Sequence, residues 1–229
     1  MKKLCIILAL LLALSTLCAC RRTVPEEKTT AATTTEPITM DPTLPLAYDP
    51  ILDEYARLVK AHSDDYDAWE TLGFNEVPQE YKEGSLGYAI KDINGDLVPE
   101  LLLLDKESGS PGQPFIYALY TLKDRTPVLI GQYWSRSRAH IAADGRIFTV
   151  GSSSAFSTYL DSYELRRGAH ELTQMTEYYS DVGDDGKQFY VMIRGSAREA
   201  LSEHQFDTLV GLYETPANLI RFEFIPIDR

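Results

Sequence analysis

The chain has 229 residues, a formal net charge of −12 and three cysteines, all of them among the first twenty residues. So acidic a balance argues against nucleic acid as a partner and against a surface that rests flat on anionic lipid, whereas it suits solubility and cation binding. Because no cysteine follows residue 20, disulfides, zinc–thiolate sites and cysteine nucleophiles are excluded from the folded part, which must be stabilised by its core.

Residues 1–19 have the pattern of an export signal. Lys2 and Lys3 precede an uncharged apolar run over residues 4–17. The run is shorter than the roughly 20 apolar residues of a transmembrane helix, and its length is typical of a signal peptide. A buried core helix or an uncleaved anchor is the alternative, but neither explains a run that starts behind two lysines and stops at a cysteine. Loss of the two lysines would take the net charge to −14.

The signal ends in Leu17, Cys18, Ala19 and Cys20. This ending resembles the bacterial lipobox, in which an aliphatic residue stands three positions before an invariant cysteine, although Cys18 stands where alanine or serine is usual. The resemblance implies that the chain is cut before Cys20 and that the sulfur of Cys20 carries a diacylglyceryl lipid with palmitate-type chains. The protein would then be anchored to a membrane through this lipid, facing outside or into the periplasm. Two acyl chains suffice for stable anchoring.

Residues 20–48 comprise the lipidated cysteine and a predicted tether. The stretch is rich in threonine and proline and poor in large apolar residues, a composition that cannot bury a core and stays extended or disordered. As a flexible coil it would reach roughly 30 Å. We therefore expect a single globular domain over residues 49–229, held away from the membrane surface.

Two helical segments are predicted at the start of this domain. The first, over residues 49–61, begins with Asp49 as a cap and Pro50 at the first helical position, and apolar residues follow at helical spacing on one face. The second, over residues 64–82, is a poorer helix that is broken near Gly73 and Pro78.

From residue 86 the apolar residues alternate with period two, which predicts strands. The predicted strands cover residues 86–91, 100–105, 115–122, 128–134, 146–150, 156–165, 171–179 and 188–194. Turn signals such as Asn-Gly and Asp-Gly separate them, and the short connections imply antiparallel neighbours.

The end of the chain is predicted to hold a helix over residues 202–213 and a last strand over residues 219–225. Ser202 and Gln205 form a capping box, and Leu201 with Phe206 forms a hydrophobic staple. The predicted fold class is therefore α+β: N-terminal helices, a meandering antiparallel β-sheet, a C-terminal helix and a final strand. A β-propeller is the alternative, but no internal repeat supports it.

One loop, between the first two predicted strands, carries a pattern of metal ligands. Oxygen-bearing side chains occupy its positions 1, 3, 5 and 9, at Asp92, Asn94, Asp96 and Glu100, and the carbonyl of Val98 at position 7 would add a fifth oxygen. Calcium takes six to eight oxygen ligands, and alternate residues of a tight loop can supply them. The loop is therefore a candidate calcium site of weak, extracellular-type affinity, about 10⁻⁴ to 10⁻³ M.

This loop resembles the calcium loops of FG-GAP and related exported repeats, and the first half of an EF-hand or dockerin loop. It departs from them at Leu97, where those loops carry a glycine that bends the chain, and at Leu103, where an EF-hand has a bidentate glutamate. The alternative interpretation is a hairpin turn at Asn94 and Gly95 with solvated acidic neighbours.

A wider resemblance covers residues 87–92 and 100–102, which are similar to a segment of uncharacterised lipoproteins of gut Firmicutes. Those proteins pair an N-terminal helix with a strand, an acidic loop and a second strand, and their C-terminal ends resemble residues 203–225 of this chain. The resemblance implies an architecture and a location but no activity, since no function is established for that family.

No catalytic motif was found, but aromatic residues are frequent in the predicted strands. The histidines lack metalloprotease spacing, and Gly151-Ser152-Ser153-Ser154-Ala155 lacks the final glycine and the following helix of a nucleophile elbow. The strand aromatics are Tyr133, Trp134, Tyr159, Tyr163, Tyr178, Tyr179 and Tyr190. Such residues can bind sugars or peptides, although they more often pack in cores or as cross-strand pairs.

The leading functional hypothesis is a non-catalytic binding or interaction module at the cell surface, stabilised by calcium, with a glycan or a protein as its ligand. The alternative is a hydrolase of cell-wall or other polysaccharide, which needs only two carboxylates about 5–10 Å apart. A third possibility is an accessory lipoprotein that stabilises a membrane complex. A cleft with two close carboxylates would favour the enzyme, and an aromatic face would favour binding.

Overall fold

The computed structural model describes residues 39–227, apart from 79–80, 111–112, 153, 155–156, 184–185, 214 and 216–217. The predicted signal peptide, Cys20 and most of the predicted tether lie outside the described residues. Within the described part of the chain, no helix is long and apolar enough to cross a membrane.

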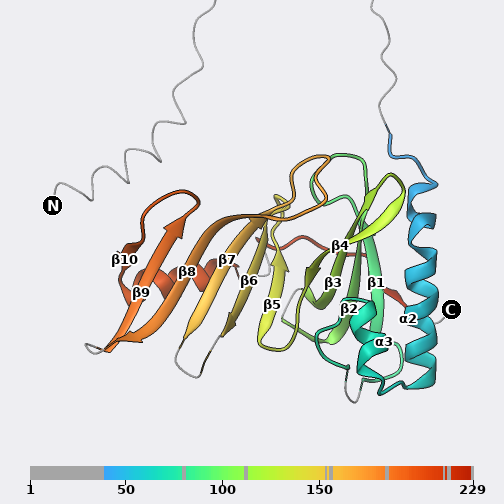
Figure 1. The fold of residues 1–229 in the computed structure, drawn as a ribbon, viewed down its shortest axis with the longest axis horizontal. Helices are drawn as coiled ribbons and strands as arrows, with labels where there is room; N and C mark the ends of the chain where they lie inside the picture. The colour runs from blue at the N-terminus through green and yellow to red at the C-terminus, as the bar shows by residue number, and fades with distance from the viewer. Residues whose placement is uncertain are drawn as a thin grey trace, which may run out of the picture. The chain divides into compact units, whose positions relative to one another are not determined.

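The described residues form an α+β fold that is dominated by strands in two antiparallel sheets (Figure 1). The first sheet has the order β11-β1-β2-β3-β4 and contains β1 (Leu86–Lys91), β2 (Glu100–Ser110), β3 (Gln113–Lys123), β4 (Thr126–Gln132) and β11 (Ile225–Pro226). The second has the order β10-β9-β8-β7-β6-β5 and contains β5 (Ser137–Ile141), β6 (Ile147–Ser152), β7 (Thr158–Glu164), β8 (Thr173–Gly183), β9 (Gly186–Ile193) and β10 (Glu199–Leu201).

The predicted meander is therefore present, but it is divided between two sheets. Consecutive strands pair with one another up to β4, and a tight turn with an isolated bridge between Trp134 and Ser137 then starts the second sheet. Strands β5 and β10 were not predicted from the sequence, since both are short and carry few apolar residues at alternate positions.

One face of the first sheet is covered by the N-terminal helices. A short 3-10 segment, η1 (Leu44–Tyr48), leads into α2 (Asp49–Ala61), which ends at the predicted residue and begins one residue earlier than predicted. The predicted cap is wrong: the N-cap is Tyr48, no side chain caps the helix, and Asp49 is already helical. The second predicted helix is limited to α3 (Tyr66–Thr71), because Gly73 adopts a φ of +77° and turns the chain.

The leucine run of β2 shows how the first sheet is buried on both sides. Leu101 and Leu103 pack in a core with α2 and α3, whereas Leu102 and Leu104 pack in a second core with residues of β5 and β6. All four side chains are fully buried. A central strand that is covered on both faces needs apolar residues at every position, which explains the unbroken run.

The second sheet is covered unequally. At its β5–β6 end, Ala139, Ile141 and Ile147 pack against the first sheet. Farther out, β7, β8 and β9 extend away from the first sheet (Figure 1). The helix α4 (Glu203–Tyr213) packs on this sheet through Phe206, whose ring centroid is 5.3 Å from that of Phe189. The predicted capping box is confirmed by reciprocal hydrogen bonds between residues 202 and 205.

The predicted last strand is wrong for most of its length. Only Ile225 and Pro226 pair with β1, and an isolated bridge joins Leu219 to Ala142, at the end of β5. The segment passes from the second sheet to the first, so it cannot follow one strand ladder. Its alternating pattern instead places Ile220, Phe222 and Phe224 against the core between the sheets.

Candidate ligand-binding groove

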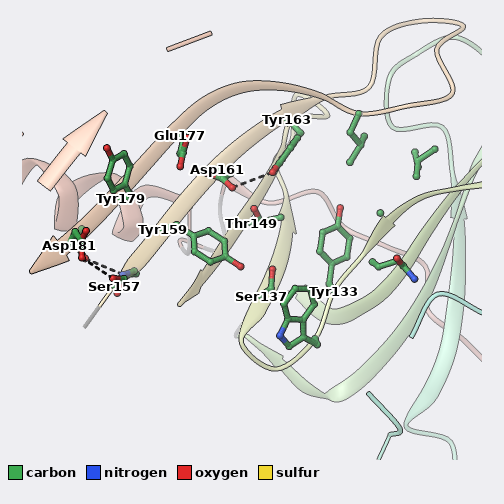
Figure 2. A pocket seen from close by; sticks show the side chains of 17 residues that line it. Tyr133, Ser137, Thr149, Ser157, Tyr159, Asp161, Tyr163, Glu177, Tyr179 and Asp181 are labelled. Carbon is green, nitrogen blue, oxygen red and sulfur yellow. Dashed lines mark hydrogen bonds between the residues drawn. The ribbon is translucent and has the colours of Figure 1, made fainter. Parts of the chain in front are cut away.

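A groove of about 590 Å³ lies where the two sheets diverge (Figure 2). Its floor is formed by β6, β7 and β8, and its wall by residues 130–134 at the end of β4. The groove follows from the fold: the second sheet continues beyond the point at which the first sheet covers it, so part of its inner face is open.

Aromatic side chains line this groove from both sheets. Tyr159 and Tyr179 lie directly opposite each other on β7 and β8, and Tyr163 follows on the same face of β7. Tyr133 and Trp134 contribute from the wall. All five were among the aromatics singled out by the sequence analysis. Alternate residues of a strand share one face, and this alternation brings the three floor tyrosines together.

Two carboxylates lie between these rings. Asp161 of β7 is directly opposite Glu177 of β8, and both line the groove (Figure 2). The hydroxyl of Tyr163 donates to Oδ2 of Asp161 at 3.2 Å, while Oδ1 is shielded from solvent and has no hydrogen-bond partner. Burial raises the pKa of Asp161 to about 6 and the carboxylate of Glu177 adds to the rise, while hydrogen bonding to the side chains of Tyr163 and Gln174 opposes it.

Tyr133 supplies a second polar atom of the same kind. Its side chain is only 4% exposed, and its hydroxyl has no hydrogen-bond partner. Burial raises the pKa of this hydroxyl well above its usual value, with the nearby Tyr163 adding to the effect. The lining of the groove therefore includes two side chains with an unpaired polar atom that is closed to solvent, the Tyr133 hydroxyl and Oδ1 of Asp161.

The charge of the lining is of one sign. Three acidic side chains line the groove, Asp161, Glu177 and Asp181, and no lysine, arginine or histidine is among the described residues that do so. A cation lies just outside, where the guanidinium carbon of Arg198 is 3.3 Å from the ring centroid of Tyr190 and 5.2 Å from that of Tyr179.

The predicted calcium loop lies elsewhere, between β1 and β2, and its first half is tightly wound. Oδ1 of Asp92 accepts the backbone N–H of Gly95 at 2.7 Å, and Oδ2 accepts that of Leu97 at 2.9 Å. Leu97 itself has a φ of +71°, the left-handed conformation that favours glycine. The residue that departs from the calcium-loop pattern thus adopts the turn for which those loops use glycine.

Asp96 joins this loop to the second sheet. Its Oδ1 accepts the N–H of Val98 at 2.9 Å, and its Oδ2 accepts the Asn94 side-chain amide at 3.1 Å and the N–H of Gly168 at 2.9 Å. Gly168 belongs to the connection between β7 and β8. The same junction is close-packed at Gly145, where a Cβ atom would overlap the carbonyl oxygen of Ile93.

Glu100 points into the protein and away from the other loop acids. It is fully buried, its Oε2 accepts the N–H of Ile93 at 3.0 Å, and its Oε1 accepts the hydroxyl of Thr121 at 3.0 Å. Burial raises the pKa of this carboxyl to about 8, with Asp96 and Asp92 adding to the rise and the two hydrogen bonds opposing it.

The structure thus brings together Asp92, Asn94 and Asp96, whereas both oxygens of Glu100 are engaged in the core. The carbonyl of Val98 belongs to the same loop. Among the described residues, no group of three or more histidine, cysteine, aspartate or glutamate side chains is placed to hold a metal ion. Calcium binding at this loop stays a prediction.

Comparisons with known proteins identify no family. No family model matches the chain, and no curated protein matches it. A solved structure described as that of a Xanthomonas type IV secretion system related protein is similar over 51% of this chain and 58% of its own length, with 16% identity and a TM-score of 0.30. This chain therefore matches little more than half of that protein, and a likeness at this TM-score carries no argument about fold or function.

The sequence analysis did not single out Asp161 and Glu177. The signal was present, because Asp161 stands two residues from Tyr159 and from Tyr163, and Glu177 stands two residues from Tyr179. In a strand this spacing places each acid on the same face as its tyrosine neighbours. What the sequence does not show is which face of the sheet is open.

Proposed function

We propose that this chain is an exported, membrane-anchored binding module that holds a saccharide ligand in the groove between its sheets. The observation that carries the proposal is an open groove lined from both sheets by five aromatic side chains, with the carboxylates of Asp161 and Glu177 directly opposite each other on its floor.

A saccharide meets the chemical requirements of this groove. Its hydroxyl groups can donate to the carboxylates that line the groove, those of Asp161, Glu177 and Asp181. The flat tyrosine rings offer apolar area that matches the C–H faces of a sugar ring, and their hydroxyls add polar edges. A mostly preformed concave site with a few convergent polar groups is the usual form of a small-ligand site.

The proposal is tested by screening the full chain in detergent against a glycan array and then measuring the affinity of the strongest ligand by calorimetry. Tyr159→Ala and Tyr179→Ala are expected to weaken binding about tenfold each, because each removes a ring from the floor. Tyr66→Ala, at a tyrosine of α3 that is 43% exposed, is the matched control. The absence of any glycan ligand, or equal affinity in all three variants, would contradict the proposal.

The location is proposed from the sequence pattern at Cys20. A radioactive fatty acid fed to the producing bacterium is expected to label the wild-type protein and not Cys20→Ala. Labelling of the variant would show that the lipid is attached elsewhere or that the lipobox resemblance is misleading.

A second candidate function is hydrolysis of a glycosidic bond, and the pairing of Asp161 with Glu177 favours it. With a pKa of about 6, Asp161 can hold a proton and donate it to the glycosidic oxygen, while the Glu177 carboxylate attacks the anomeric carbon or activates water. Water supplies the hydroxyl of the new reducing end. Release of reducing ends by the wild type, lost in Glu177→Gln and Asp161→Asn, would make the protein an enzyme.

We also propose that calcium binds weakly at the Asp92–Glu100 loop. Support comes from the oxygen pattern of the sequence and from the side chains of Asp92, Asn94 and Asp96, which share one tight turn. Because Glu100 is engaged in the core, the loop offers fewer oxygens than calcium requires, and water would complete the shell.

A further inference from the structure

We propose that the groove selects a saccharide with a free, protonated amino group, seated between the carboxylates of Asp161 and Glu177 and against the rings of Tyr159 and Tyr179. This inference rests on the proposed function, because it names the class of saccharide that the same groove would take.

The two carboxylates of the floor create a need for a cation. Asp161 and Glu177 are directly opposite each other on adjacent antiparallel strands, the closest relation that two side chains of a sheet can have. Like charges in this position destabilise a sheet. Asp181 adds a third acid, and no basic side chain is among the described residues that line the groove. An ammonium group between the two carboxylates would turn this repulsion into attraction.

The pairing of Asp161 also fits an ammonium group. Tyr163 donates to Oδ2 of Asp161, and no lysine, arginine or histidine is among the groups that shift the pKa of this carboxyl. A protonated amine has three donors and no acceptor, so it can donate to the carboxylates of Asp161 and Glu177 at once. The raised pKa of Asp161, caused chiefly by burial, is the response expected of a carboxyl that lacks a cationic partner.

The tyrosines form a row in which the outer rings already hold a cation. Tyr159, Tyr179 and Tyr190 are directly opposite one another across β7, β8 and β9. The guanidinium of Arg198 lies over Tyr190 and within cation–π range of Tyr179. Among the described residues, no lysine or arginine lies over Tyr159 or Tyr163. At the groove end of the row, Tyr159 therefore offers the same kind of aromatic ring that binds Arg198 at the other end. The carboxylates of Asp161 and Glu177 lie beside it.

Other ligands fit the groove less well. A neutral saccharide could use the rings but would leave the Asp161–Glu177 repulsion in place, and an acidic saccharide would be repelled by all three lining acids. The net charge of −12 further attracts cations from solution.

The inference is tested with two tetrasaccharides that differ only in acetylation, the glucosamine tetramer and its fully N-acetylated counterpart. Each is titrated into the full chain in detergent near pH 6.5, where many of the free amines carry a proton. The glucosamine tetramer is expected to bind at least tenfold more tightly, with a margin that shrinks as salt is added. Asp161→Asn and Glu177→Gln, which keep the side-chain shape, should each reduce the margin to about threefold or less.

Asp64→Asn is the matched control, because Asp64 is exposed and lies outside the groove, between α2 and α3. It should leave the margin unchanged, and thermal melting of each variant shows whether it is folded. Equal or tighter binding of the acetylated tetramer would overturn the inference and leave the proposed function standing. Binding of neither tetramer, nor of any glycan on the array, would overturn the proposed function itself. If the glucosamine tetramer keeps its tenfold advantage in both Asp161→Asn and Glu177→Gln, the amino group binds elsewhere, and its assignment to these two carboxylates is overturned.

Discussion

The carboxylate of Asp96 accepts the backbone N–H of Gly168 at 2.9 Å, although the two residues belong to connections of different sheets. The same carboxylate also accepts the N–H of Val98 and the side-chain amide of Asn94. One acidic side chain thus shapes its own loop and joins that loop to the second sheet. The acidic loop is therefore part of the framework, whether or not it binds an ion.

Asp96→Ala is expected to lower the free energy of unfolding by about 1–3 kcal/mol, because it leaves three donors without their acceptor. Urea denaturation of the full chain measures the change. Asp64→Ala, at an exposed acid between α2 and α3, should change the free energy by less than about 0.5 kcal/mol. Equal losses in the two variants would mean that Asp96 does not join the sheets.

A comparison of Gly145→Ala with Gly168→Ala distinguishes two costs of adding a Cβ atom, the strain of a left-handed backbone and steric overlap with a neighbouring segment. Both glycines have a positive φ, of +85° and +70°, so either alanine should cost about 1–2 kcal/mol for the left-handed backbone. At Gly168 nothing lies within 4 Å of the added Cβ, whereas at Gly145 it would overlap the carbonyl oxygen of Ile93. We expect Gly145→Ala to unfold at clearly lower urea than Gly168→Ala; matching midpoints would contradict the close approach of the two connections.

Glu100→Gln should remove a pH dependence of stability. The pKa of Glu100 is about 8 in the folded chain and near its ordinary value of 4.5 when the chain unfolds. Between these values the folded chain keeps a proton that the unfolded chain releases, so this contribution is complete below about pH 4.5 and is lost as the pH rises through 8. The amide can keep both hydrogen bonds, because the hydroxyl of Thr121 can accept as well as donate.

Urea denaturation of the wild type and of Glu100→Gln at a series of pH values checks this expectation. Stability of the wild type relative to the variant should fall by a few kcal/mol, in order of magnitude, between pH 5 and pH 9. Comparison with the variant removes the contributions of Asp161 and His140, whose pKa values are also shifted by burial. Parallel curves would show that Glu100 titrates normally.

Calcium should stabilise the protein slightly if it binds the acidic loop. With a dissociation constant of about 1 mM, 10 mM calcium adds roughly 1.4 kcal/mol, which raises the melting temperature by about 3–6 °C for a domain of this size. Asp92→Asn removes one ligand charge and should abolish the shift, while 10 mM magnesium is the ionic control. An unchanged melting temperature with calcium and with chelator would end the calcium proposal.

Much of the fold could be predicted from the sequence because local patterns and tertiary packing agree there. The strand over Leu86–Lys91 has the bounds that its periodicity predicts, and the helix over Asp49–Ala61 differs from its prediction only by one residue at its start. The segment after Leu219 has a strand pattern but no continuous ladder, because its neighbours change from one sheet to the other along its length. The sequence of this segment therefore predicts which side chains are buried, but it does not predict which strand the segment pairs with.

The candidate site could be predicted only in its aromatic half. The tyrosines stood out by number and by their place in predicted strands, but core packing explained them equally well. Asp161 and Glu177 are brought together by the register of β7 and β8, and the open face depends on where the second sheet leaves the first. Neither the register nor the divergence of two sheets is encoded in a local pattern.

The path of residues 218–227 has a consequence for how the chain reaches its folded state. Gly87 pairs with Pro226 and Ala142 with Leu219, so both sheets wait for partners that are synthesised late. Contacts between residues so distant in sequence form slowly. If the chain is exported as we propose, these two contacts could form only after residues 219–226 had left the export channel, so the chain would cross before either contact is made.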